Sequence, residues 1–157
     1  MAAEVGTSAP LFSLDGSDNT DEGRRRYSLS DYRGQVVVLV FYPGDSTPVC
    51  TRQLNAYTED IASFEEAGAQ VLAISPQSVQ SHDDFACKQG GFGFPLLADT
   101  DKSVGDAYGI LGPLGFYRRS VFVIDAEGIT RYAHRAIAGL TFRSTRELVE
   151  AVRSARG

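Results

Sequence analysis

One stretch of the chain constrains its fold more than any other: an apolar run at residues 36–42, a loop flanked by two prolines, and a segment of helical period. The run holds only aliphatic and aromatic side chains, which predicts a strand buried on both faces of a sheet. In residues 48–67, apolar side chains recur at spacings of three and four, which predicts one amphipathic helix that ends at Gly68. These side chains are Leu54, Tyr57, Ile61 and Phe64.

The rest of the chain repeats this alternation of strands and helices. Apolar runs and a turn predict two more buried strands and a hairpin partner, at residues 69–75, 120–125 and 129–133. Helical periodicity predicts three more helices, at residues 78–89, 101–110 and 144–155. Ser144 and Glu147 stand at the spacing of a capping box. This order predicts an α/β sandwich in which helices flank a mixed sheet, with the strand at 36–42 in its centre.

Length and composition indicate one folded domain over residues 1–157. With 43% hydrophobic and 22% charged residues, a chain of 157 residues can bury a substantial core. The formal net charge of −5 argues against nucleic acid or an anionic membrane as a partner. The basic cluster Arg24, Arg25 and Arg26 lies in a polar stretch, and we expect it in a solvated loop.

The sequence shows no membrane span and no secretory signal. Its apolar stretches stay well short of the ~20 residues that a spanning helix needs. Residues 1–6 lack the charged and apolar regions of a signal peptide. We therefore expect a cytoplasmic, reducing compartment, in which the two cysteines carry out chemistry rather than staple the fold. Two cysteines and two histidines, widely spaced, offer no zinc-binding pattern.

Cys50 lies where a thiol becomes reactive. Thr47 is a favourable N-cap and Pro48 a favourable first helical residue, which places Cys50 at the third helical position. The positive end of a helix favours the thiolate, the nucleophilic form of cysteine. A thiolate that attacks a peroxide also needs hydrogen-bond donors and positive charge for the departing oxyanion. The Thr47 hydroxyl and first-turn N–H groups can supply donors, and Arg118 or Arg119 the charge.

The motif Pro43-x-x-x-Thr47-x-x-Cys50 resembles the active-site motif of peroxiredoxins, and its flanks are similar to the bacterioferritin-comigratory-protein subgroup, also called PrxQ. The resemblance extends over nearly the whole chain, through segments at residues 9–14, 29–34, 81–85, 94–99 and 119–125. It implies a thioredoxin-like fold with an N-terminal hairpin extension. It also implies a monomeric, thiol-dependent peroxidase that reduces hydrogen peroxide and organic hydroperoxides without metal, haem or flavin.

The resemblance also implies the roles of individual residues. Cys50 matches the peroxidatic cysteine, which becomes a sulfenic acid, Thr47 matches the motif threonine, and Arg119 matches the catalytic arginine. The implied substrate contacts are Pro43, Thr47, Val49, Cys50 and Arg119.

Two positions depart from the family pattern. Val49 stands where the family commonly has glycine, and Gln53 stands where it commonly has glutamate. An amide at position 53 can still bond to an arginine but loses the ion pair, so we expect Arg119 to be held less tightly.

Cys87 lies in the helix predicted at residues 78–89. It follows Phe85 by two positions, about 200° around the helix, so it faces away from the core when Phe85 points inward. Some subgroup members carry a resolving cysteine five residues after the peroxidatic one, where this chain has Asn55, and others carry it in the next helix. The resemblance thus implies that Cys87 forms an intramolecular disulfide with Cys50, which thioredoxin or a similar dithiol protein reduces.

The formation of that disulfide implies motion. Bridging requires the two Cα atoms within about 7 Å, so a fold that holds them farther apart must unwind locally. The glycine-rich segment at 90–93 follows Cys87 and makes the end of its helix easy to unwind.

Other functions remain open on the sequence alone. If Cys87 takes no part in the reaction, the chain is a one-cysteine peroxidase. A second alternative is a thioredoxin-fold dithiol–disulfide oxidoreductase, which normally uses a Cys-x-x-Cys pair that is absent around Cys50. A third is a redox sensor or holdase, which would turn over little peroxide. A Cys–His hydrolase leaves Thr47 and Arg119 unexplained. We expect His82 and His134 to be surface residues and Tyr42 to form a wall of the site.

Overall fold

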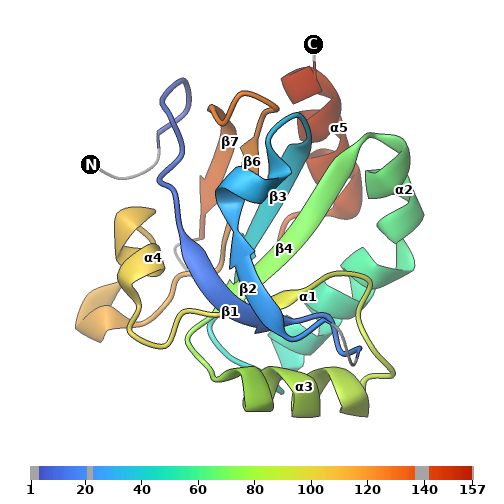
Figure 1. The fold of residues 1–157 in the computed structure, drawn as a ribbon, viewed down its shortest axis with the longest axis vertical. Helices are drawn as coiled ribbons and strands as arrows, with labels where there is room; N and C mark the ends of the chain where they lie inside the picture. The colour runs from blue at the N-terminus through green and yellow to red at the C-terminus, as the bar shows by residue number, and fades with distance from the viewer. Residues whose placement is uncertain (1–3, 21–22, 137–141, 157) are drawn as a thin grey trace.

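The fold is built on one mixed sheet, which has seven strands among the described residues (Figure 1). The computed structural model describes residues 4–20, 23–136 and 142–156. The strands lie in the order β2-β1-β5-β4-β3-β6-β7; β4 pairs in parallel with β3 and β5, and the other pairs are antiparallel. They are β1 (Ser13–Ser17), β2 (Arg25–Ser28), β3 (Val36–Phe41), β4 (Ala69–Ser75), β5 (Leu96–Ala98), β6 (Ser120–Ile124) and β7 (Thr130–Arg135).

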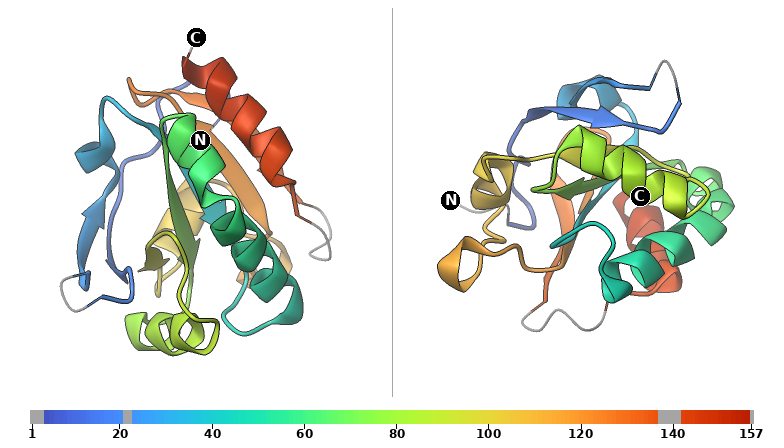
Figure 2. Two further views of the ribbon diagram at one scale, coloured as in Figure 1. Left: turned by 90° about the vertical axis from the view of Figure 1, so that its right-hand side faces the viewer. Right: turned by 90° about the horizontal axis from the view of Figure 1, so that it is seen from below.

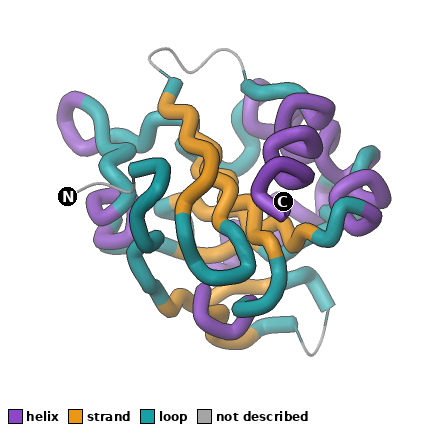
Figure 3. Tube along the Cα trace, turned by 90° about the horizontal axis from the view of Figure 1, so that it is seen from above, coloured by secondary structure: helices purple, strands orange, loops and turns teal. Residues whose placement is uncertain are grey.

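Helices flank the sheet and one of them covers an end of it, as the predicted α/β sandwich requires (Figures 2 and 3). They are α1 (Pro48–Glu59), α2 (Ile61–Glu66), α3 (Val79–Lys88), α4 (Ser103–Ala107) and α5 (Thr145–Arg156), with 3₁₀ turns η1 (Leu29–Tyr32) and η2 (Pro113–Gly115). Helices α1, α2 and α5 lie on one side of the sheet and α4 on the other, while α3 lies across the end at which β3 and β4 finish (Figure 1). No helix in the described ranges is long and apolar enough to cross a bilayer.

Strand β3 sends alternate side chains into two separate cores. One core joins Val36, Val38 and Val40 to apolar side chains of α1, α2, α3 and α5. The other joins Val37, Leu39 and Phe41 to side chains of β1, β2 and α4. Both faces of the strand are therefore covered, which explains why its sequence is a continuous apolar run. The exact middle of the sheet is β4, and β3 lies next to it.

The N-terminal hairpin extends the same sheet instead of packing beside it. Strands β1 and β2 form the hairpin, and β1 also pairs with β5. The expected solvated loop at Arg24–Arg26 is therefore wrong: Arg25 and Arg26 lie in β2 at the sheet edge, although their side chains are exposed. Arg26 forms an ion pair with Asp15 of β1 at 3.2 Å. Charged side chains are common on edge strands, where they discourage pairing with other chains.

The predicted single helix at residues 48–67 is interrupted. Asp60 has φ −101° and ψ 17°, outside helical geometry, and it separates α1 from α2. The apolar stripe continues across the break, and Leu54, Tyr57 and Phe64 are fully buried. The helix predicted at 101–110 is shorter, at Ser103–Ala107.

The predicted starts of two helices are confirmed by their caps. The Ser81 N–H donates to Oγ of Ser78 at 3.1 Å at the start of α3. At the start of α5, the Glu147 N–H donates to Oγ of Ser144 at 3.2 Å, as the capping-box spacing predicts.

Candidate active site

Cys50 and Arg119 meet because β3 and β6 are neighbours in the sheet. Phe41 at the end of β3 pairs with Ser120 at the start of β6, so Arg119 lies beside the point where the chain leaves β3. From there a short loop turns the chain into α1, whose third residue is Cys50. Two segments far apart in sequence are thus brought to one end of the sheet.

The guanidinium of Arg119 contacts the Cys50 sulfur directly. Its Nη2 donates to Sγ of Cys50 at 3.2 Å, and its Nη1 donates to Oε1 of Gln53 at 2.6 Å. Cys50 and Gln53 are fully buried, and Arg119 is 4% exposed. A charge shielded from water acts more strongly on its neighbours than one on the surface. The neighbouring Arg118 is exposed, so of the two candidate arginines it is Arg119 that the structure brings to the thiol.

Gln53 is oriented by a chain of hydrogen bonds. Its Nε2 donates to Oη of Tyr57 at 3.4 Å, and the Tyr57 hydroxyl donates to the backbone oxygen of Arg143 at 2.6 Å. Burial raises the pKa of Tyr57 to about 12, so this hydroxyl stays neutral near pH 7. Because the amide nitrogen faces Tyr57, the amide oxygen faces Arg119. An uncharged side chain thus bonds to the arginine where the family pattern has a carboxylate.

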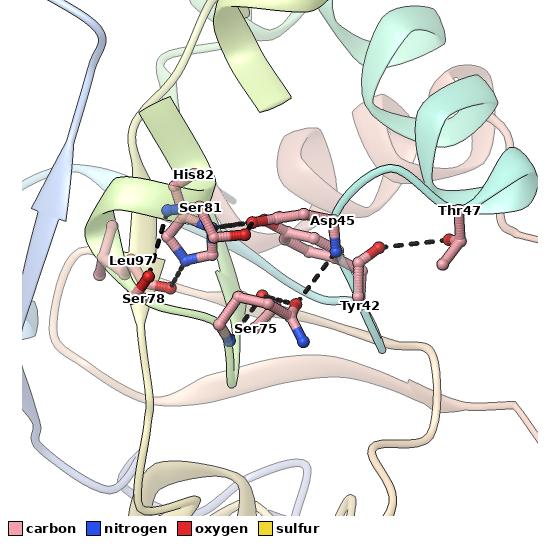
Figure 4. A network of polar contacts seen from close by, with 10 residues as sticks. Tyr42, Asp45, Thr47, Ser75, Ser78, Ser81, His82 and Leu97 are labelled. Carbon is pink, nitrogen blue, oxygen red and sulfur yellow. Dashed lines mark hydrogen bonds and ion pairs between the residues drawn. The ribbon is translucent and has the colours of Figure 1, made fainter. Parts of the chain in front are cut away.

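Thr47 stands at the N-cap of α1, as predicted, but its hydroxyl does not cap the helix. Oγ1 instead donates to the backbone oxygen of Gly44 at 3.2 Å (Figure 4). Since this bond uses the hydroxyl proton, the lone pairs of Oγ1 can accept a hydrogen bond from another molecule. The other implied substrate contacts, Pro43 and Val49, are half-buried in the same loop and first turn.

The expectation that His82 is a surface residue is wrong. Its side chain is fully buried, and both ring nitrogens have partners: Nδ1 lies 2.7 Å from Oδ2 of Asp45, and Nε2 lies 2.9 Å from the backbone oxygen of Leu97 (Figure 4). The sequence contains a signal for this burial. His82 precedes Phe85 by three positions, which places it within about 60° of Phe85 on the buried face of α3. His134 is half-buried in β7.

Asp45 is the centre of this polar network. Its carboxylate accepts hydrogen bonds from the hydroxyls of Tyr42 and Ser81, each at 2.7 Å, besides its contact with His82. Burial alone would raise the pKa of Asp45, but the hydrogen bonds and charge of His82, with those of Ser81 and Tyr42, hold it below its ordinary value. Burial, and next the Asp45 charge, raise the pKa of Tyr42 well above its ordinary value. Tyr42 is therefore a neutral, fully buried donor in the wall of the site.

Cys87 faces away from this site, on the exposed side of α3. Phe85 and Ala86 of the same helix point into the core that contains Cys50. On its outer side Cys87 lines a cleft with Arg24 and Asp83, which form an ion pair at 2.6 Å. The predicted outward direction of Cys87 is thus confirmed, and the two thiols are not paired in this state.

Comparisons with known proteins agree with this arrangement. The sequence profile of the AhpC/TSA family matches residues 5–133. "Putative peroxiredoxin bcp" of Coxiella burnetii is 38% identical over 136 residues, covering 82% of this chain and 86% of that protein. Mouse "Peroxiredoxin-2" is 39% identical over 136 residues, covering 82% of this chain and 68% of that protein. A solved structure of Xylella fastidiosa PrxQ, in a mutant form, has a TM-score of 0.84 and 28% identity, covering 98% of each chain.

A buried cysteine at a helix N-terminus, held against an arginine on a thioredoxin-like fold, defines a thiol-based redox enzyme. The chain belongs to the AhpC/TSA family, and its similarity to the bcp and PrxQ proteins supports the bacterioferritin-comigratory-protein subgroup of peroxiredoxins. It is accordingly a thiol-dependent peroxidase.

Proposed function

We propose that Cys50 is the peroxidatic nucleophile for hydrogen peroxide and organic hydroperoxides, and that Arg119 and Thr47 complete its catalytic site. In the first step the Cys50 thiolate attacks one peroxide oxygen, so an S–O bond forms and the O–O bond breaks. Cys50 is oxidised to sulfenic acid, the peroxide is reduced, and the departing oxyanion takes up a proton to leave as water or an alcohol. No bound cofactor takes part in this proposed step.

The hydrogen bond from Arg119 to the Cys50 sulfur is the observation that carries the proposal. A guanidinium at 3.2 Å favours the thiolate over the thiol, and it remains beside the oxygens as negative charge moves onto the leaving one. Gln53 holds the second arm of the guanidinium, which keeps the donor aimed. The lone pairs of Thr47 Oγ1 are available to accept the hydroxyl proton of the peroxide.

Cys87 completes the proposed cycle as the resolving cysteine. Its thiolate attacks the Cys50 sulfenic acid, an S–S bond forms, and the hydroxyl leaves with a proton as water. A dithiol protein of the thioredoxin type then reduces the disulfide and becomes oxidised itself. The exposed position of Cys87 supports access for such a reductant, and the outward direction of its side chain requires α3 to rearrange before the bond can form.

The proposal is tested by thiol counting and intact mass after one equivalent of hydrogen peroxide, on the wild type and on Cys87→Ser. We expect the wild type to lose both thiols within one monomer and Cys87→Ser to stop at a trappable sulfenic acid on Cys50. Cys50→Ser is the matched control, and we expect it to consume no peroxide. A Cys50 thiol that survives peroxide in both proteins would refute the role of Cys50.

A one-cysteine cycle is the second candidate, and the separation of the two thiols favours it: Cys50 is buried and Cys87 is exposed on the far side of α3. In that cycle a small thiol or another protein reduces the sulfenic acid directly. The same experiment distinguishes the two cycles. If the wild type also stops at sulfenic acid with Cys87 free, the one-cysteine cycle is correct.

We further propose that the chain works as a monomer in the cytoplasm. A reducing thiol pool keeps both cysteines reduced between turnovers, which suits a recycled peroxidase. Light scattering of the reduced and oxidised protein tests the oligomeric state, and a stable dimer in either form contradicts the monomer.

A further inference from the structure

The proposed disulfide requires α3 to leave its place, so the contacts that hold α3 control that step. Phe85 and Ala86 turn one face of the helix toward the core of Cys50, and Cys87 occupies the opposite face. The thiol must move around the helix, or the last turn must unwind, before the two sulfurs can bond. Beyond the buried Phe85 and Ala86, the end of α3 is held by backbone hydrogen bonds such as Gly91 N–H to the Ala86 oxygen at 2.7 Å, while Cys87 and Lys88 are exposed, so this last turn can open without burying or exposing further apolar side chains.

Besides the apolar contacts of Phe85 and Ala86, α3 has a buried polar attachment at His82, between one and two turns before Cys87. This side chain links α3 to the loop that leads from β3 to Cys50, because its Nδ1 lies 2.7 Å from Oδ2 of Asp45 in that loop. Ser81 adds a second bond from α3 to the same carboxylate. The outer face of α3 is also attached, through the ion pair of Arg24 with Asp83, but Arg24 is half-exposed and such surface pairs contribute little.

The hydrogen-bond partners of His82 fix its charge. Nε2 faces a backbone carbonyl, which can only accept, so Nε2 carries a proton. Nδ1 faces the Asp45 carboxylate, which as an anion also only accepts, so Nδ1 carries a proton too. His82 is therefore an imidazolium paired with a carboxylate, and the two side chains are 0% and 4% exposed. Separating the two side chains leaves each buried charge without its partner, which costs free energy.

We propose that the Asp45–His82 ion pair is the latch that holds α3 closed against the Cys50 loop, and that it sets how often Cys87 is released to form the disulfide. This inference rests on the proposed two-cysteine cycle. The closed state keeps the loop of Thr47 in place for the peroxide step, whereas the open state is needed for the disulfide step. Since the open state is a small minority, weakening the latch multiplies the open population while the closed population hardly changes.

Asp45 and His82 are therefore positioning residues. Their loss should accelerate the disulfide step and leave the peroxide step nearly unchanged. In His82→Gln and in Asp45→Asn, we expect the disulfide to form about tenfold faster after the sulfenic acid appears. Sulfenic acid formation, measured for His82→Gln in the Cys87→Ser background, is expected to change less than about twofold. The double variant is expected to match the single ones, because either substitution alone already breaks the latch.

Asp125→Asn is the matched control. Asp125 is another buried carboxylate with several donors, including Arg131 at 2.7 Å, but it follows β6 at the other end of the sheet from the loop of Asp45. It should destabilise the fold without accelerating the disulfide step. An equal acceleration in Asp125→Asn, an unchanged rate in the single latch variants, or multiplied effects in the double variant would each overturn the latch.

Hydrogen–deuterium exchange of residues 79–91 in the reduced protein tests the latch without turnover. We expect exchange about tenfold faster in both latch variants than in the wild type and in Asp125→Asn. This measurement separates two kinds of failure. Absence of sulfenic acid on Cys50 refutes the proposed function, whereas unchanged exchange in α3 refutes the latch even when the chemistry proceeds.

Discussion

The two cysteines of this chain lie in contrasting surroundings. Cys50, in the first turn of α1, is enclosed by the loop that follows β3 and by Arg119, which directly precedes β6. Cys87 projects from a single helix into an exposed cleft. The first thiol is fully prepared before a peroxide arrives, whereas the second must be brought to its partner by motion. Preorganisation and mobility are thus placed on different elements, which Asp45 and His82 join.

The largest effect expected at the Cys50 site comes from Arg119→Ala. Loss of the guanidinium removes a buried donor from the reacting sulfur and its oxygens, so we expect sulfenic acid formation to slow by about 10²- to 10³-fold. Stopped-flow rates in the Cys87→Ser background isolate this step. Arg118→Ala is the control, because that side chain is exposed, and it should change the rate less than about twofold. Equal effects of the two substitutions would contradict the preorganised site.

The sequence was sufficient to predict the Cys50 site, the preorganised one of the two regions. The order of strands and helices and the motif around Cys50 are local patterns, and they locate the strand, the loop and the helix start together. The resemblance then selects Arg119 across a separation of 69 residues. The interruption at Asp60 was missed because the apolar period continues across it, so periodicity alone does not detect a one-residue break.

The network that joins the two regions was not predicted. Asp45 and His82 are 37 residues apart, and each is unremarkable in its own segment. Their contact depends on how α3 lies across the end of the sheet, which local patterns do not determine. The edge strand β2 was missed for a related reason. Its run of arginines is polar enough to suggest a loop, and only pairing with β1 makes it a strand.

The joining network predicts a pH dependence of stability. The pKa of Asp45 is lower folded than its ordinary value of 3.8, so its carboxylate stabilises the fold above that value and this contribution is lost as pH falls through the folded pKa. We expect Asp45→Asn to lower the free energy of unfolding by about 3 kcal/mol at neutral pH. The deficit relative to wild type should shrink in acid, below about pH 4. Urea denaturation at neutral and acid pH measures it, and a deficit independent of pH contradicts the ion pair.

A smaller effect sharpens the description of the Cys50 site. Gln53→Glu replaces a neutral acceptor by a charged one, and charge-assisted hydrogen bonds are about twice as strong as neutral ones. We expect the guanidinium to be held more firmly and sulfenic acid to form about threefold faster. The rate is measured in the Cys87→Ser background, with Gln53→Ala as the control that removes the acceptor and slows the step. An unchanged rate in Gln53→Glu would mean that the 2.6 Å amide bond already holds Arg119 fully.

The smallest expected effect concerns Cys87, the exposed thiol. Cys87 is exposed, so replacing its sulfur by oxygen in Cys87→Ser exchanges one solvated group for another. We expect the free energy of unfolding of the reduced protein to change by less than about 0.5 kcal/mol. Cys50→Ser places a hydroxyl in a fully buried site and should cost more, about 1–3 kcal/mol. Urea denaturation under reducing conditions compares them. Equal losses would mean that Cys87 contributes to the packing of α3 and is not a mobile thiol.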